Sequence, residues 1–219
     1  MADLTAAEAA HLDRLGGKAR GYTVGTRIRE AEVSVTNLET DAASAQRFIA
    51  LPLSTWRQSA SNDIPDVTDT PATNDQYGGL LHKGSQPILE FANVDTDSAL
   101  RLHFAASTAY AIVNQTPLPP DIDVSTNVVL HIRAAMAGAT DTPVIDADSY
   151  FNEGDSKVSD ASAAITGTSY AEYTVTVAAA DVPTGAQTVT IELTPAAHTT
   201  DILYISATWL EYTRSQLSS

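Results

Sequence analysis

Residues 201–214 read DILYISATWLEYTR, and the expected fold follows from this stretch. Apolar residues fall on both sets of alternate positions along its length. A strand with two apolar faces belongs in the centre of a sheet that is covered on both sides. We therefore expect a central β-strand here, with Trp209 in the core.

Six shorter runs upstream alternate apolar and polar residues with a period of two, as half-buried antiparallel strands do. Proline and glycine gather between the runs, where they favour turns. The long segments 58–79 and 113–127 suit the crossover connections of a jelly roll. The sequence thus predicts a mainly β fold, an antiparallel jelly-roll-like β-sandwich over residues 48–219. The six runs are RFIALPLSTW (47–56), ALRLHFA (99–105), NVVLHIRAAM (127–136), PVIDADSYF (143–151), AEYTVTVA (171–178) and QTVTIELT (187–194).

A different apolar period precedes the sandwich. Between residues 27 and 47, apolar residues recur in steps of three and four, which is the spacing of a coiled-coil seam. Serine, threonine and asparagine make this segment a weak helix, so we expect it to hold only by self-association. We predict a short oligomerisation segment over 27–47, and an attachment segment over 1–26. The seam residues are Ile28, Ala31, Val35, Leu38, Ala42 and Ala45.

The chain is acidic, and its charge is unevenly placed. The net charge is −15, and residues 51–219 hold six Lys or Arg against twenty Asp or Glu. This body is expected to repel nucleic acid and anionic membranes. The absence of cysteine excludes disulfides and thiolate metal sites. No stretch has the apolar length of a membrane span and the N terminus does not read as a signal peptide, so we expect synthesis in a cytoplasm.

The chain shows no catalytic or nucleotide-binding motif, and we expect no cofactor, no metal and no enzymatic activity. His103 and His131 each fall on the polar side of a strand beside an arginine. They are either cross-strand neighbours that bind an acidic group or parts of a solvated strand face. Asp146 and Asp148 point the same way from one strand, which leaves a calcium site or a catalytic carboxylate pair as the alternative to solvated acids.

Exposed aromatic side chains can form platforms that bind sugars. Tyr77 and Tyr110 lie near predicted loops, so they are our candidate ligand contacts. The other aromatic residues weighed for this role are Trp56, Tyr150, Tyr170 and Trp209.

Residues 48–214 resemble the small fibre and decoration proteins of tailed-bacteriophage virions that end in a jelly-roll domain. The resemblance is carried by SNDI (61–64), GGLL (78–81), ALRLHFAAS (99–107), the stretch 117–143 and AHTTDILYISATWLEYTR (197–214). It implies a structural virion protein, made in the host bacterial cytoplasm, that serves as a trimeric capsid decoration or head fibre. It also implies that the N-terminal segment binds another virion protein of the capsid or neck. It transfers no active site.

Two other functions stay open at this point. The alternative is a tail-associated receptor-binding fibre protein whose loops grip a host-surface glycan. The lack of a long repeated shaft favours the head over the tail. The third is a glycan-degrading enzyme built around Asp146 and Asp148, which would have to show hydrolase activity.

Overall fold

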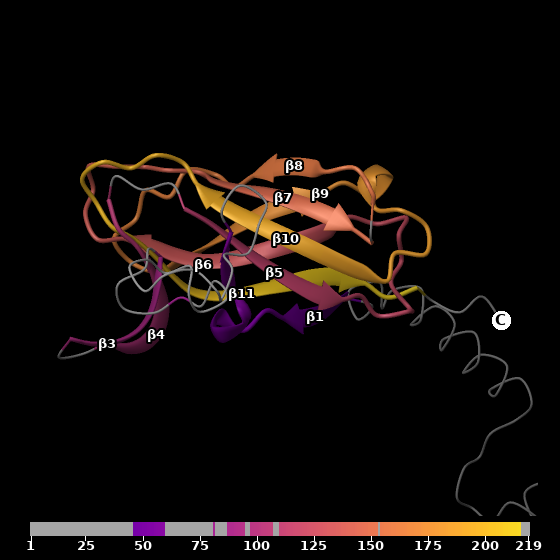
Figure 1. Ribbon diagram of the computed structural model, residues 1–219, viewed down its shortest axis with the longest axis horizontal. Helices are drawn as coiled ribbons and strands as arrows, with labels where there is room; N and C mark the ends of the chain where they lie inside the picture. Colours follow the sequence, from indigo (N-terminus) through magenta and orange to yellow (C-terminus); the bar gives the residue numbers. More distant parts are fainter. Residues whose placement is uncertain are drawn as a thin grey trace, which may run out of the picture. The chain divides into compact units, whose positions relative to one another are not determined.

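The computed structural model of the chain describes residues 46–59, 81, 87–94, 97–106, 110–152 and 154–215 (Figure 1). The predicted attachment segment, the coiled-coil seam and Tyr77 lie outside the described residues. The domain division at residue 48 therefore stays a prediction. The first described strand begins two residues earlier, at Gln46.

Eleven strands in the described residues form two antiparallel sheets that face each other. The larger sheet has six strands, and the smaller has five (Figure 1). This arrangement confirms the predicted mainly β sandwich. The six-stranded sheet contains β1 (Gln46–Ala50), β3 (Ile88–Val94), β4 (Asp97–Phe104), β6 (Val128–Met136), β9 (Ala171–Val177) and β11 (Leu203–Thr213). The five-stranded sheet contains β2 (Arg57–Ser59), β5 (Ala111–Pro117), β7 (Ile145–Phe151), β8 (Val158–Ala161) and β10 (Thr188–Pro195).

The strand order is jelly-roll-like. One sheet contains the order β4-β11-β6-β9, and the other contains β5-β10-β7-β8. The chain changes sheet at almost every connection from β4 onward, and its last strand lies beside β4. Such long-range antiparallel pairing is the pattern of two Greek keys.

The stretch 201–214 contains the central strand of the larger sheet, as predicted. One edge of β11 pairs with β6, and the other edge pairs first with β4 and then with β1. A bulge between Ile205 and Ala207 shifts the alternation by one residue. Before the bulge Ile205 is buried, and after it Thr208 and Leu210 are buried. Trp209 therefore faces outward, and its predicted place in the core is wrong.

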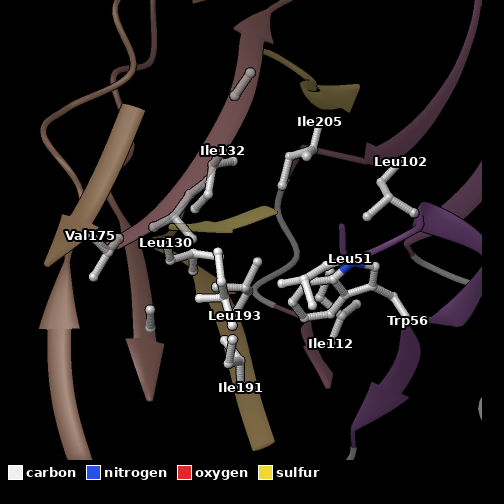
Figure 2. Packing of buried hydrophobic residues seen from close by; sticks show 14 of the residues in the cluster. Leu51, Trp56, Leu102, Ile112, Leu130, Ile132, Val175, Ile191, Leu193 and Ile205 are labelled. Carbon is white, nitrogen blue, oxygen red and sulfur yellow. The ribbon is translucent and has the colours of Figure 1, made fainter. Parts of the chain in front are cut away.

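The core lies between the two sheets and takes its side chains from both (Figure 2). Trp56 is 1% exposed, and its indole Nε1 donates to Thr208 Oγ1 at 3.1 Å, so its candidacy as an exposed sugar platform is wrong. Burying a tryptophan this way also satisfies its single polar atom. Figure 2 labels Leu51, Trp56, Leu102, Ile112, Leu130, Ile132, Val175, Ile191, Leu193 and Ile205.

The segment 113–127, predicted as a loop, begins inside a strand. β5 runs from Ala111 to Pro117, and its inward positions include the buried polar residues Asn114 and Thr116. Asn114 Nδ2 donates to Thr55 Oγ1 at 2.6 Å, which compensates the burial of the amide. Polar residues at inward positions hide the alternation that the prediction relied on.

Two aspartates clamp the loops that lead into β7 and β11. Asp201 Oδ2 accepts from the backbone N–H groups of Thr140 and Asp141, at 2.6 and 2.9 Å. Asp141 Oδ2 accepts in return from the N–H groups of Thr200 and Asp201, at 2.6 and 2.8 Å. A Cβ at Gly138 would overlap the Asp201 carboxylate, so this close approach requires glycine.

Within the described residues, no helix is both long and apolar enough to span a membrane.

Candidate functional site

The outward side of the six-stranded sheet gathers aromatic, cationic and acidic side chains from six segments. Alternate side chains of a strand point to opposite sides of the sheet. In β6 and β11 one set of side chains therefore packs in the core, and the other set faces outward. We call this set the aromatic face. Its members are Phe48, Glu90, Arg101, His103, His131, Arg133, Tyr170, Glu172, Tyr204, Trp209 and Glu211.

Trp209 and His131 form the first cluster of the aromatic face. They are register partners on β11 and β6, and their rings stack with centroids 4.9 Å apart and planes 8° apart. His131 Nδ1 lies 2.8 Å from Glu172 Oε1, and its Nε2 lies 3.0 Å from Glu211 Oε2. Both ring nitrogens of His131 therefore lie within hydrogen-bond distance of a glutamate oxygen. Phe48 of β1 meets the His131 ring edge-on at 6.5 Å.

Tyr204 is the centre of the second cluster. The Arg101 guanidinium lies 3.7 Å from the centroid of the Tyr204 ring, a cation–π distance. Arg101 Nε donates to Glu90 Oε1 at 2.7 Å. His103 meets the Tyr204 ring edge-on at 5.5 Å. Its Nδ1 lies 3.3 Å from Glu90 Oε1, close enough for an ion pair but outside hydrogen-bond geometry.

The ion pair of this cluster perturbs both of its partners. Burial raises the pKa of Glu90, but the hydrogen bond from Arg101 and the proximity of His103 outweigh burial, so the pKa lies below its ordinary value. Burial lowers the pKa of Arg101, but the hydrogen bond to Glu90 and the nearby Tyr170 hydroxyl outweigh burial, so that pKa lies above its ordinary value. Both pKa shifts therefore favour the charged forms of Arg101 and Glu90 in the folded protein.

Tyr170 and Arg133 lie where the two clusters approach each other. The Tyr170 hydroxyl is buried beside Arg101, although it forms no well-aligned hydrogen bond. The Arg133 guanidinium lies 6.0 Å from the centroid of the Tyr170 ring. Arg133 is exposed and pairs in register with Ala207 on one side and Glu172 on the other.

The predicted residues fall partly on this face. His103 and His131 both belong to it, but they are not cross-strand neighbours, because β11 lies between β4 and β6. The acidic groups that they meet are glutamates of the chain itself. Tyr110 directly precedes β5 in the other sheet, and Tyr77 is outside the described residues, so both stay predictions as ligand contacts.

Asp146 and Asp148 lie on the opposite outward side, that of the five-stranded sheet. Asp148 Oδ2 accepts from Lys157 Nζ at 2.9 Å. Tyr150 follows on the same strand. Burial, with Glu192 and Asp148 adding to it, raises its pKa. No group of three or more histidines, aspartates or glutamates in the described residues could hold a metal ion.

The sequence contained one signal for the aromatic face that the prediction did not use. Trp209 and Glu211 alternate along one side of β11, and His131 and Arg133 alternate along the matching side of β6, whereas Tyr204 joins that side only through the bulge. The prediction used these strands to assign the core. An aromatic residue on the half that faces water is the informative observation in such a strand.

No protein-family model and no curated protein matches this chain. Several solved structures to which the chain is similar are carbohydrate-binding modules. A xylan-binding module CBM15 matches with a TM-score of 0.45 and 12% identity, over 78% of this chain and 99% of that one. A xylan-binding domain from CBM22 matches with a TM-score of 0.42 and 12% identity, over 76% and 91%. A family 16 carbohydrate-binding module matches with a TM-score of 0.36 and 12% identity, over 52% and 78%. Likeness at this level carries no argument about what this chain binds.

Proposed function

We propose that the sandwich binds a carbohydrate chain on its aromatic face, without catalysing a reaction. The observation that supports the proposal is the gathering of Trp209, Tyr204 and Tyr170 with ion-paired groups on one outward sheet face. A sugar ring has an apolar side of C–H bonds and an edge of hydroxyl groups. Aromatic rings beside oriented donors and acceptors match both of these surfaces.

Glu172 illustrates how the polar groups serve such a ligand. Its side chain is 50% exposed, and one of its oxygens, Oε1, bonds to His131. A carboxylate can accept about four hydrogen bonds, so it keeps free acceptor positions for sugar hydroxyls. The His131 bond holds that acceptor in place, which lowers the entropy lost on binding.

The spacing of the aromatic residues suits an oligosaccharide. Tyr204 and Trp209 are separated along β11 by five residues, one of them in the bulge, which corresponds to about 13 Å at the rise of a strand. One sugar ring cannot contact both side chains at this distance. We expect a ligand of several sugar residues that lies along β11.

The proposal of binding without catalysis rests on the partners that the carboxylates of the aromatic face already have. Glu90 accepts from Arg101, and Glu172 and Glu211 each lie within hydrogen-bond distance of a His131 ring nitrogen. Glycoside hydrolysis needs one carboxylic acid that gives a proton and a second carboxylate that attacks or activates water. Carboxylates that are already held by such partners within the protein suit neither role.

A glycan array tests the proposal, followed by titration of any glycan that binds. Replacing Trp209 with alanine should weaken binding at least tenfold, as loss of a central aromatic contact does. The matched control is Tyr150→Ala, which removes an aromatic ring from the opposite sheet and should leave the affinity unchanged. Equal affinity in wild type and Trp209→Ala, or equal loss in both variants, would refute binding at the aromatic face.

The second candidate is display on a bacteriophage virion, supported by the resemblance carried by residues 48–214. In this proposal the chain is a trimeric capsid decoration or head fibre, anchored through residues 1–26. A glycan-binding sandwich would instead suit a tail-associated receptor reader, where linked copies gain avidity for a host surface. Deleting residues 1–26 should abolish incorporation into particles, and normal incorporation would refute the attachment role.

A further inference from the structure

Arg133 differs from the other cations of the described residues. Its guanidinium makes no hydrogen bond or ion pair to any described residue, although the chain carries twenty-seven acidic side chains. The other arginines and the lysine have polar partners. Arg101 bonds to Glu90, Lys157 to Asp148 and Arg214 to Asp121, and Arg47 and Arg57 donate to backbone carbonyls.

Arg133 has no carboxylate partner because the acidic residue opposite it in the sheet bonds to another side chain. Glu172 is the register partner of Arg133 and lies on the same face, so it is the carboxylate best placed to pair with it. His131 takes Glu172 Oε1 at 2.8 Å instead. Arg133 is thereby left as an exposed guanidinium in an acidic protein.

The position of Arg133 places it within the proposed binding face. Along β6 it lies two residues from His131, a separation of about 7 Å, and His131 supports the Trp209 ring. On its other side is Tyr170, whose ring lies 6.0 Å away. Its neighbour on β11 is Ala207, a residue too small to cover it. A sugar that lies along β11 from Trp209 towards Tyr170 would pass beside the guanidinium.

We propose that Arg133 binds the carboxylate of an acidic sugar, so that the aromatic face prefers a glycan containing uronate residues. This inference rests on the proposed carbohydrate-binding function. A guanidinium presents a planar fork of donors that pairs with both oxygens of a carboxylate, and a singly charged carboxylate suits an acidic protein better than a doubly charged phosphate. The net charge of −15 repels dense polyanions, so the preferred glycan carries isolated acidic residues.

Matched ligands test the inference on the full chain. A glycan array carries uronate-containing oligosaccharides together with their carboxyl-reduced forms. The two forms differ only in the carboxyl group, which the reduced form replaces with a hydroxymethyl group. For wild type, the acid form should bind roughly three- to tenfold tighter, the range expected for a partly exposed bidentate pair. Arg133→Gln should reduce the acid form to the affinity of the reduced form. Glu172→Gln should increase the preference, because it removes a like charge beside the ligand carboxylate.

The outcomes separate this inference from the proposed function. If both forms bind equally to wild type, or if Arg133→Gln keeps the preference, carbohydrate binding stands and the role of Arg133 is overturned. Tighter binding of sulfated or phosphorylated analogues, or a preference lost in Glu172→Gln, also overturns it. If no glycan binds in either form, the proposed function itself fails. The control Arg57→Gln, on the other sheet, should behave as wild type.

Discussion

The two sheets of the sandwich present different outward faces over one shared core. The six-stranded sheet turns Trp209, Tyr204 and paired charges outward. The five-stranded sheet turns outward Thr190, Thr194 and carboxylates such as Asp146, from strands of the same regular alternation. Inward, both sheets supply isoleucine, leucine and valine. The inward-facing side chains of both sheets therefore determine the fold, whereas the outward-facing side chains can differ from one sheet to the other.

The largest effect is expected in the core that both faces share. Replacing Trp56 with alanine removes a side chain that is 1% exposed and its bond to Thr208. We expect a loss of about 3–5 kcal/mol in the free energy of unfolding, measured by urea denaturation. A change below about 1 kcal/mol would contradict the placement of Trp56 between the sheets.

The next effect separates the two faces. His131→Ala leaves Glu172 and Glu211 without their shared partner and removes the ring beneath Trp209. We expect a loss of about 1–3 kcal/mol in the free energy of unfolding, together with weaker glycan binding. Thr190→Ala on the opposite face should change that free energy by less than about 0.5 kcal/mol. Similar values for the two variants would mean that the faces are equivalent.

A smaller effect concerns acid on the aromatic face. The folded-state pKa of Glu90 is lowered, so its ionised form stabilises the fold above the unfolded pKa, near 4.5, and this contribution is lost as the pH falls through the lowered value. Glu90→Gln should reduce the free energy of unfolding at pH 7 by at most about 1 kcal/mol. The difference from wild type should vanish in acid. A difference that persists at pH 2 would show that charge is not its cause.

The smallest effect has the opposite sign and lies in the other sheet. Burial, and then the charge of Asp181, raise the pKa of Asp160 on β8. A raised carboxyl pKa means that ionisation destabilises the fold, so stability falls as the pH rises from about 3.8 through the folded-state value. Asp160→Asn should therefore stabilise the protein at pH 7 by a few tenths of a kcal/mol. A destabilised variant, measured by the same urea titration, would contradict this.

Much of the fold could be predicted from alternation alone. The runs around Leu130, Val175 and Ile191 form strands because a period of two leaves them one apolar side to bury. The alternation pattern does not predict β5, because the polar residue Asn114 occupies a buried position and bonds to a residue far away in the sequence. The short strand β2 contains Arg57 and two buried polar residues, so it carries no apolar alternation either.

The candidate site was less accessible to sequence reasoning. His131 was identified on a polar strand face, but its partners are 41 and 80 residues away, and no local pattern pairs such positions. Trp209 was assigned to the wrong side of its strand. Arg133 could be recognised as unpaired only once its register partner Glu172 was seen to bond elsewhere.

The sequence by itself determined that residues from 48 onward form a sandwich of antiparallel strands, because alternating side chains can bury one face only by stacking two sheets. It also determined which strand is central, through the apolar residues on both sides of 201–214. Only the tertiary structure decided which of those sides meets solvent, because one bulged residue between Ile205 and Ala207 reverses the alternation after it. The aromatic face follows from that reversal, since it turns Trp209 outward to stack on His131.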